Sequence, residues 1–189
     1  MMNQNADHRE IPQSEETVFN GVLIHVNHMQ VELPNGEKAL REIVLHPGAS
    51  AVVALDDQGQ ILLVRQHRVA IDRLTLEIPA GKLDSPDEDP FLCAQRELEE
   101  ETGMKAKHWR KLTVLATTPG FCNERIHMYM ATGLEEGTVN LDEDEFLTVS
   151  RMPLEEAVAN VMNGTFRDGK TCLGIMMAAQ IVASEHKND

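Results

Sequence analysis

The sequence predicts a mixed α/β fold: an α/β/α sandwich with a mixed sheet, preceded by a small N-terminal antiparallel β-sheet. Apolar and polar residues alternate over residues 17–45, short apolar runs separated by turn signals follow up to residue 81, and both patterns are typical of strands; a helix with clear start and stop signals comes next. Further strand-like stretches then lead to two apolar helices near the C-terminus. Strands and helices in this order form a mixed sheet covered by helices.

The first element is an antiparallel meander. Apolar and polar residues alternate from Thr17 to Leu45, and "PNG" at 34–36 is a turn signal between two such runs. The meander has too few residues for a core of its own, so it must pack on the main domain or on a second subunit. We therefore expect a β-meander over residues 1–46 and the main domain over residues 47–189.

The main domain is predicted to begin with two strands, Ala51 to Leu55 and Ile61 to Gln66, joined by the tight turn "DDQG". A third short apolar segment, "LTLEIPAG", ends at Gly81. The residues from 90 to 102 predict a helix, because a proline stands in its first turn and Gly103 follows its last.

The second half of the chain predicts two strands within residues 108–134, separated by a Pro-Gly loop. An acidic loop and another strand follow within residues 142–153. Pro153 to Asn163 and Thr171 to Ser184 are predicted to be amphipathic or buried helices.

Composition limits the function classes. A chain of 189 residues with 42% hydrophobic and 25% charged residues is typical of a globular protein, and no apolar run approaches the roughly 20 residues that cross a bilayer. The net charge of −14 would repel nucleic acid and anionic lipid. The three cysteines form no CxxC pair, and the polar stretch "MMNQNADHREIPQSEE" resembles no signal peptide. We expect reduced thiols, a frayed N-terminal end and a cytoplasmic protein that binds neither nucleic acid nor membrane.

The 90–102 helix carries an acidic face. Glu97, Glu100 and Glu101 lie three and four residues apart, so they share one face and repel each other by a few tenths of a kcal/mol per pair. A divalent cation would remove this repulsion, and Mg²⁺ and Mn²⁺ prefer such oxygen ligands. A solvated acidic face is the alternative interpretation of these residues.

The surrounding residues resemble a known motif. The stretch from Gly81 to Met104 has a glycine, six residues, Glu88, seven residues and then Arg96 and Glu97 in "RELEEETGM". This order is similar to the Nudix box of the Nudix hydrolases, with one extra residue between the glycine and the first glutamate. The resemblance implies an enzyme that hydrolyses a nucleoside diphosphate linked to another group, using Mg²⁺ or Mn²⁺ and metal-activated water.

Position by position, the resemblance assigns metal ligation to Glu97, Glu100, Glu101 and the backbone carbonyl of Ala80. It also implies a supporting role for Gly81, Glu88 and Arg96. Positioning and charge neutralisation account for most of the catalysis of phosphoryl transfer, which agrees with this arrangement.

Four further stretches resemble the ADP-ribose pyrophosphatase branch of the family, and with the box the likeness runs from about residue 51 to 179. They are "LLVRQHR" at 62–68, "LEIPAGKLD" at 76–84, "TPGFCNERIHMYMA" at 118–131 and "GTFRDGKT" at 164–171. The likeness implies hydrolysis of ADP-ribose to AMP and ribose 5-phosphate. Hydrolysis of GDP-mannose or another nucleotide sugar is the alternative within the family, and a non-catalytic nucleotide-binding module is the alternative from another class.

Substrate-binding candidates come from these stretches. Arg65 and Arg68 stand at a strand end and could hold a diphosphate as bidentate forks, or form a surface charge pair. The resemblance implies a ribose contact for Glu77, and the remaining candidates are Phe121, Glu124 and Arg167.

The branch takes a catalytic glutamate from a mobile acidic loop. Glu145 is the first choice here and Glu143 the second, with Glu100 as a further catalytic candidate; a solvated loop is the alternative. The resemblance also implies a homodimer that is formed in part by the N-terminal sheet.

Overall fold

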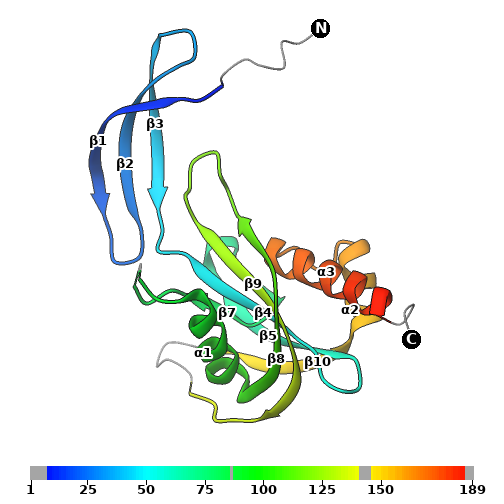
Figure 1. Cartoon of the computed structure of the whole chain (residues 1–189). Helices are drawn as coiled ribbons and strands as arrows, with labels where there is room; N and C mark the ends of the chain where they lie inside the picture. The colour runs from blue at the N-terminus through cyan, green and yellow to red at the C-terminus, as the bar shows by residue number, and fades with distance from the viewer. Residues whose placement is uncertain (1–7, 86, 141–145, 186–189) are drawn as a thin grey trace, which may run out of the picture. The chain divides into compact units, whose positions relative to one another are not determined.

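The computed structural model describes residues 8–85, 87–140 and 146–185 of the chain (Figure 1). The chain divides into two compact units. The first consists of Met1–His46 with Ala116–Glu124, and the second of Pro47–Leu115 with Arg125–Asp189.

The first unit is built on a three-stranded antiparallel sheet in the order β1-β2-β3. The strands are β1 (Ile11–Asn20), β2 (His25–Glu32) and β3 (Lys38–Leu45), and the sheet confirms the predicted meander. The expected frayed end was wrong for residues 11–16, which pair with β2 from Ile11 opposite Glu32 onward. All ten side chains of β1 are exposed, so the residues before Thr17 do not alternate between apolar and polar in the way that would have predicted a strand.

The segment from Ala116 to Glu124 joins the same unit through the end of β3. The backbone nitrogen of Val44 donates to the carbonyl of Phe121 at 2.7 Å, and that of Asn123 donates to the carbonyl of Val44 at 3.1 Å. These two bonds attach a loop of the second half of the chain to the N-terminal sheet.

The second unit contains a four-stranded mixed sheet and a three-stranded antiparallel sheet. The first has the order β7-β4-β9-β8, with β4 parallel to β9 and antiparallel to β7. Its strands are β4 (Ala49–Ala54), β7 (Ala80–Lys82), β8 (Met104–Ala116) and β9 (Arg125–Glu136). The second has the order β10-β5-β6, with β5 (Gln60–Arg68), β6 (Arg73–Glu77) and β10 (Thr148–Pro153); the 3₁₀ turn η1 (Val69–Ile71) joins β5 to β6.

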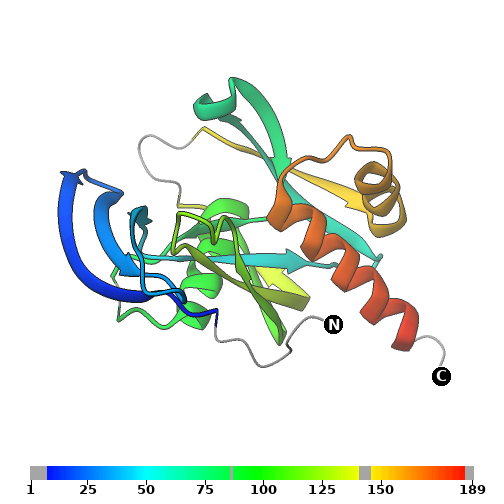
Figure 2. The same ribbon diagram turned by 90° about the horizontal axis from the view of Figure 1, so that it is seen from above.

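The second unit has three helices: α1 (Pro90–Thr102) and α3 (Gly169–Glu185) pack on the mixed sheet, and α2 (Leu154–Met162) packs on β5, β10 and α3. The side chains of β4 and β9 alternate between two cores, as the period of a strand requires. One core packs against α1, and the other packs against α2 and α3, which lie side by side (Figures 1 and 2). On the α1 side lie Val52, Ala54, Tyr129 and Ala131; on the other side lie Ala51, Val53, Met128 and Met130. This sandwich confirms the predicted fold class.

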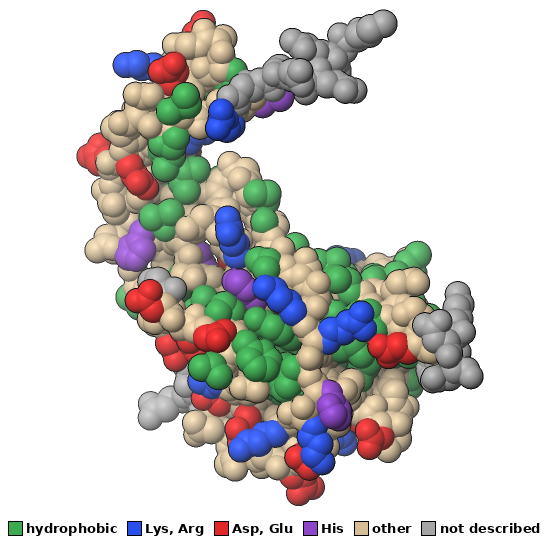
Figure 3. Space-filling model, in the orientation of Figure 1, with side chains coloured by type: hydrophobic (Ala, Val, Ile, Leu, Met, Phe, Trp, Pro, Cys, Tyr) green, Lys and Arg blue, Asp and Glu red, His purple; other side chains and the backbone are tan. Residues whose placement is uncertain are grey.

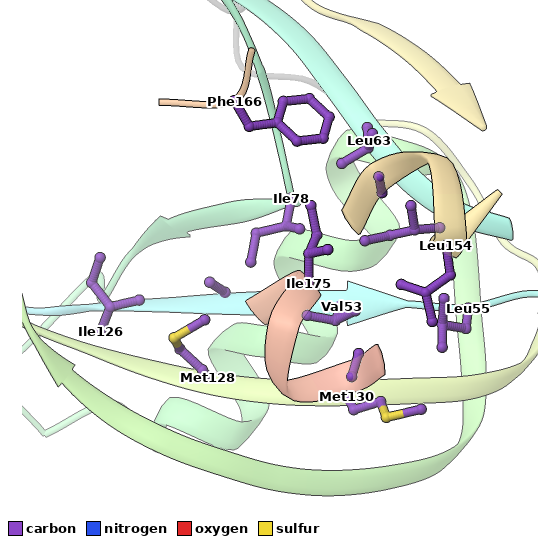
Figure 4. Close-up of a cluster of buried hydrophobic side chains, with 14 of the residues drawn as sticks. Val53, Leu55, Leu63, Ile78, Ile126, Met128, Met130, Leu154, Phe166 and Ile175 are labelled. Atoms are coloured by element: carbon purple, nitrogen blue, oxygen red, sulfur yellow. The ribbon is translucent and has the colours of Figure 1, made fainter. Parts of the chain in front are cut away.

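The larger core gathers around Ile175 of α3. Figure 4 shows Val53 of β4, Met128 of β9 and Ile78 around this side chain. Phe91 of α1, Trp109 and Tyr129 form an aromatic cluster in the smaller core, with ring centroids 5.4 to 6.5 Å apart. The two cores pack against the strands near which the candidate site lies.

The surface shows no continuous basic region on the face drawn in Figure 3, where Lys and Arg side chains lie singly among acidic and uncharged ones. Among the helices of the described residues, none is long and apolar enough to cross a bilayer.

Two glycines of α3 offer a matched test of how closely this helix approaches the sheet. A Cβ on Gly174 would lie 2.8 Å from Cγ2 of Val53, whereas a Cβ on Gly169 would meet nothing within 4 Å. Alanine favours a helix interior over glycine by up to about 1 kcal/mol, a gain that is smaller at Gly169, the first residue of α3. We therefore expect Gly174→Ala to be less stable than Gly169→Ala by roughly 1–3 kcal/mol, the usual effect of overpacking. Urea denaturation of the two variants measures the difference, and equal stability would contradict this packing.

Candidate active site

Local sequence signals fix the start and end of α1. The side chain of Asp89 accepts a hydrogen bond from the nitrogen of Phe91 at 2.8 Å, and Pro90 occupies the first turn. Gly103 ends the helix in the left-handed conformation, at φ 68°, and its nitrogen donates to the carbonyl of Glu99. With Ala94 and Leu98 buried against the sheet, the acidic face has a fixed orientation.

The acidic face of α1 is largely buried. Glu97 is 7% exposed and Glu101 only 2%, while Glu100 is partly exposed. A carboxylate in such a position needs partners, because removing it from water is costly. Glu101 accepts a hydrogen bond from the backbone nitrogen of Ala80 at 3.0 Å, so α1 holds the edge strand β7.

Arg96 connects the other acidic residues of the motif. One of its terminal nitrogens lies 2.7 Å from Glu97 Oε1 and 3.1 Å from Glu100 Oε2, and the other lies 3.2 Å from Glu88 Oε1. Burial lowers the pKa of Arg96, but the attraction of Glu97 and the bonds to Glu88 and Glu100 outweigh it, so the pKa is raised above its ordinary value. In this arrangement no three acidic, histidine or cysteine side chains of the described residues form a metal-binding cluster.

Only glycine fits at position 81, because the Glu97 carboxylate fills the space that a side chain would occupy. A Cβ built on Gly81 would lie 2.1 Å from Oε1 and 2.2 Å from Oε2 of Glu97. Backbone and carboxylate therefore meet without room for a methyl group. The structure thus brings the carbonyl-bearing strand β7 and the carboxylates of α1 into one place, where hard oxygen donors from both elements could hold a divalent cation.

Glu77 lies at the centre of a buried charge network. It is 2% exposed, and Arg68 donates to its two oxygens at 2.9 and 2.8 Å. Lys170 and the hydroxyl of Thr75 donate to the same carboxylate. Burial raises the pKa of Glu77, but the bonds from Arg68 and the charge of Lys170 lower it to about 2. A carboxylate accepts about four hydrogen bonds, so these donors leave no lone pair for the expected ribose hydroxyl.

Arg65 and Arg68 do not act as a pair in this structure. Arg65 stands opposite Leu76 in a regular register, while Arg68 bonds to Glu77, and residues three apart on a strand point to opposite faces. Arg65 instead lines a cleft of about 460 Å³ together with Arg167. The Nε of Arg167 donates to the carbonyl of Gly164 at 3.4 Å, just after α2.

Four candidates remain: Phe121, Glu124, Glu143 and Glu145. Phe121 and Glu124 belong to the first unit, where Glu124 accepts a hydrogen bond from Thr117 at 2.7 Å. Glu143 and Glu145 lie outside the described residues. The predicted roles of these four residues stay predictions.

Sequence reasoning missed Lys170, Asp168, Thr171 and Thr75. Asp168 Oδ2 accepts from the nitrogen of Thr171 at 2.9 Å, which makes it the N-cap of α3. An aspartate directly before an apolar helix is a start signal, and the stretch "RDGKT" contains it. The partner of Lys170 had no such signal, because Glu77 lies 93 residues away along the chain.

Comparison with known proteins agrees with the motif. Residues 44–171 match the family model described as the NUDIX domain. The chain is 45% identical over 164 residues to the ADP-ribose pyrophosphatase of Bacillus subtilis (strain 168), covering 86% of this chain and 88% of that protein. It is 41% identical over 174 residues to the methanol dehydrogenase activator of Bacillus methanolicus, with 91% and 94% covered.

A solved structure shows the same fold. The crystal structure of an ADP compounds hydrolase has a TM-score of 0.82 to this chain and 22% sequence identity. The match covers 94% of this chain and 96% of that chain.

The network around Glu77 predicts a dependence of stability on pH. Because its folded pKa of about 2 lies below the ordinary value of 4.5, its contribution is complete above pH 4.5 and declines as the pH falls toward 2. Glu77→Gln should therefore flatten the pH dependence of the free energy of unfolding in this window, measured by urea denaturation. Glu135→Gln, which removes an exposed pair with Lys107, should keep the parent's slope. A parent-like slope in Glu77→Gln would show that the network does not stabilise the ionised form.

Proposed function

The chain belongs to the NUDIX domain family, and we propose that it hydrolyses ADP-ribose to AMP and ribose 5-phosphate. In this reaction water adds to one phosphorus atom and the bond between that phosphorus and the bridging oxygen breaks. The observation that carries the proposal is the buried pair Glu97 and Glu101 packed against Ala80 and Gly81, in a motif with every charged residue of the box in register. The identity of 45% to an ADP-ribose pyrophosphatase over most of both chains supports the choice of substrate.

The residues present suit a divalent cation such as Mg²⁺ or Mn²⁺. The carboxylates of Glu97, Glu100 and Glu101 and the backbone carbonyl of Ala80 would hold it, and all of them are hard oxygen donors. When bound, such a cation neutralises the diphosphate and lowers the pKa of an attacking water.

The side chains of the protein supply orientation and charge. Arg96 holds Glu88, Glu97 and Glu100 through three short contacts, which fixes the carboxylates before substrate arrives. Arg68 donates two of its five N–H groups to Glu77, and the others have no partner among the described residues, so they can bind a diphosphate oxygen. Glu145 or Glu143 in the acidic loop would position the water. Arg65, Arg167, Phe121 and Glu124 remain candidates for substrate contacts on the resemblance alone.

We also propose a cytoplasmic homodimer formed through the first unit. Its sheet exposes large apolar side chains that water disfavours, which supports association of two chains through this region. They are Ile11, Val18, Phe19 and Leu40. The three cysteines are free thiols, as expected in a reducing compartment.

A substrate panel tests the reaction. Initial rates with Mg²⁺ are compared for ADP-ribose, GDP-mannose, a diadenosine polyphosphate and nucleoside triphosphates, with products resolved by chromatography. ADP-ribose should give the highest kcat/KM and yield AMP and ribose 5-phosphate. If GDP-mannose leads, the family assignment holds and the substrate is wrong; if no compound is hydrolysed, the non-catalytic nucleotide-binding module becomes the hypothesis to test.

Three glutamates of α1 test the carboxylate site. Glu97→Gln and Glu101→Gln should each lower kcat by about 100-fold or more, because each removes a charge that holds the cation. Glu99→Gln is the matched control on the same helix, since Glu99 pairs with Lys105 at 3.1 Å. Mn²⁺ binding, measured by calorimetry, should weaken in the first two variants and stay at the parent's level in the control. A fully active Glu97→Gln would rule out this site.

A further inference from the structure

Lys170 is a buried cation that the proposed reaction has not used. Its side chain is 9% exposed and donates to Glu77 and, at 3.1 Å, to Asp168 Oδ2. A lysine in such a place stays charged only with close anionic partners. The residue stands in the first turn of α3, at the junction between this helix and the strand β6 that carries Glu77.

On the side of β6, Lys170 and Arg68 share a hydrogen-bond acceptor. Both side chains donate to the same carboxylate, and Glu77 is the partner that the structure gives to the Arg68 side chain among the described residues. The Arg68 side chain itself is 43% exposed. The guanidinium of Arg68 therefore lies at the surface and is hydrogen-bonded to a buried carboxylate. Its orientation depends on the position of the Glu77 side chain.

On the side of α3, the same turn holds the backbone that leads to the candidate cation site. Asp168 Oδ2 accepts from the hydroxyl of Thr171 at 2.6 Å, and this hydroxyl accepts from the backbone nitrogen of Ile78 at 3.0 Å. Ile78 lies two residues before Ala80, whose nitrogen donates to Glu101. The first turn of α3 thus fixes both Arg68 and the strand end at Ala80.

We propose that Lys170 is a positioning residue for the reaction. It holds Glu77 so that Arg68 presents its free N–H donors to the diphosphate of the substrate, and it makes no contact with substrate itself. The inference rests on the proposed function for its kinetic readout. Its structural readout, the hydrogen bond from Arg68 to Glu77, does not.

The alternative is that Lys170 only neutralises a buried acid and stabilises the fold. The two roles differ in what a variant changes. If Lys170 only stabilises the fold, its replacement lowers the free energy of unfolding and leaves the KM of the folded enzyme unchanged. If Lys170 is a positioning residue, its replacement raises KM, because part of the binding energy is then needed to orient Arg68.

The kinetic test is a double-mutant cycle on Lys170 and Glu77. Lys170→Met should raise the KM for ADP-ribose by at least about tenfold with a smaller change in kcat. If Lys170 acts through Glu77, adding Lys170→Met to Glu77→Gln should change KM by less than about twofold. Lys107→Met, which removes an exposed lysine paired with Glu135, should match the parent. An unchanged KM in folded Lys170→Met, or fully additive effects, would overturn the proposal.

The second test is independent of hydrolysis. The Nε–H proton of Arg68, assigned in the NMR spectrum by its loss in Arg68→Lys, should exchange slowly with water in the parent because it bonds to Glu77. In Lys170→Met this exchange should be at least about tenfold faster, and an unchanged rate would overturn the proposal. If Lys170→Met does not fold, Lys170→Gln, which keeps an N–H donor without the charge, serves in both tests and should show the same direction of change. A parent that does not hydrolyse ADP-ribose would refute the proposed function, and the exchange rates would still decide the role of Lys170.

Discussion

The contact between the backbone of β7 and the carboxylates of α1 is the constraint on which the rest of the site depends. Glu101 accepts from the nitrogen of Ala80, and Glu97 fills the space beside Gly81. These contacts keep two charged groups out of water, a cost that would destabilise the fold unless donors and cations stood beside them. Asp89, Gly103 and the buried face of α1 fix the helix, and the helix in turn fixes the strand.

The basic side chains near the site each contact acidic side chains. In a chain with a net charge of −14, Arg96 is bonded to three acidic residues of the motif, and Arg68 and Lys170 share one buried carboxylate. Each of these basic side chains therefore orients acids as well as neutralising them. An arginine fork suits this task, since its planar donors restrain the carboxylate in direction as well as in distance.

The sequence was sufficient for elements whose signals are local. Pro90 and Gly103 bounded α1 correctly, apolar runs joined by a turn signal revealed β4 and β5, and alternation revealed the meander from Thr17 onward. The sequence was insufficient where contacts between distant parts of the chain determine the structure. The first half of β1, before Thr17, is ordered by pairing with β2, and its exposed side chains show no alternation of apolar and polar residues. The Glu77–Lys170 contact joins residues 93 positions apart. The motif could be identified from the sequence, because its charged residues lie within one continuous stretch of the chain.

The segment from Ala116 to Glu124 has a consequence for how this architecture could be rearranged. The chain passes between the two units three times, at residues 46–47, 115–116 and 124–125. The N-terminal sheet is therefore not a cassette that can be exchanged by a single recombination event. Removing residues 1–46 would strip Phe121 and Asn123 of their bonds to Val44, so a shortened gene would also need a new turn between β8 and β9.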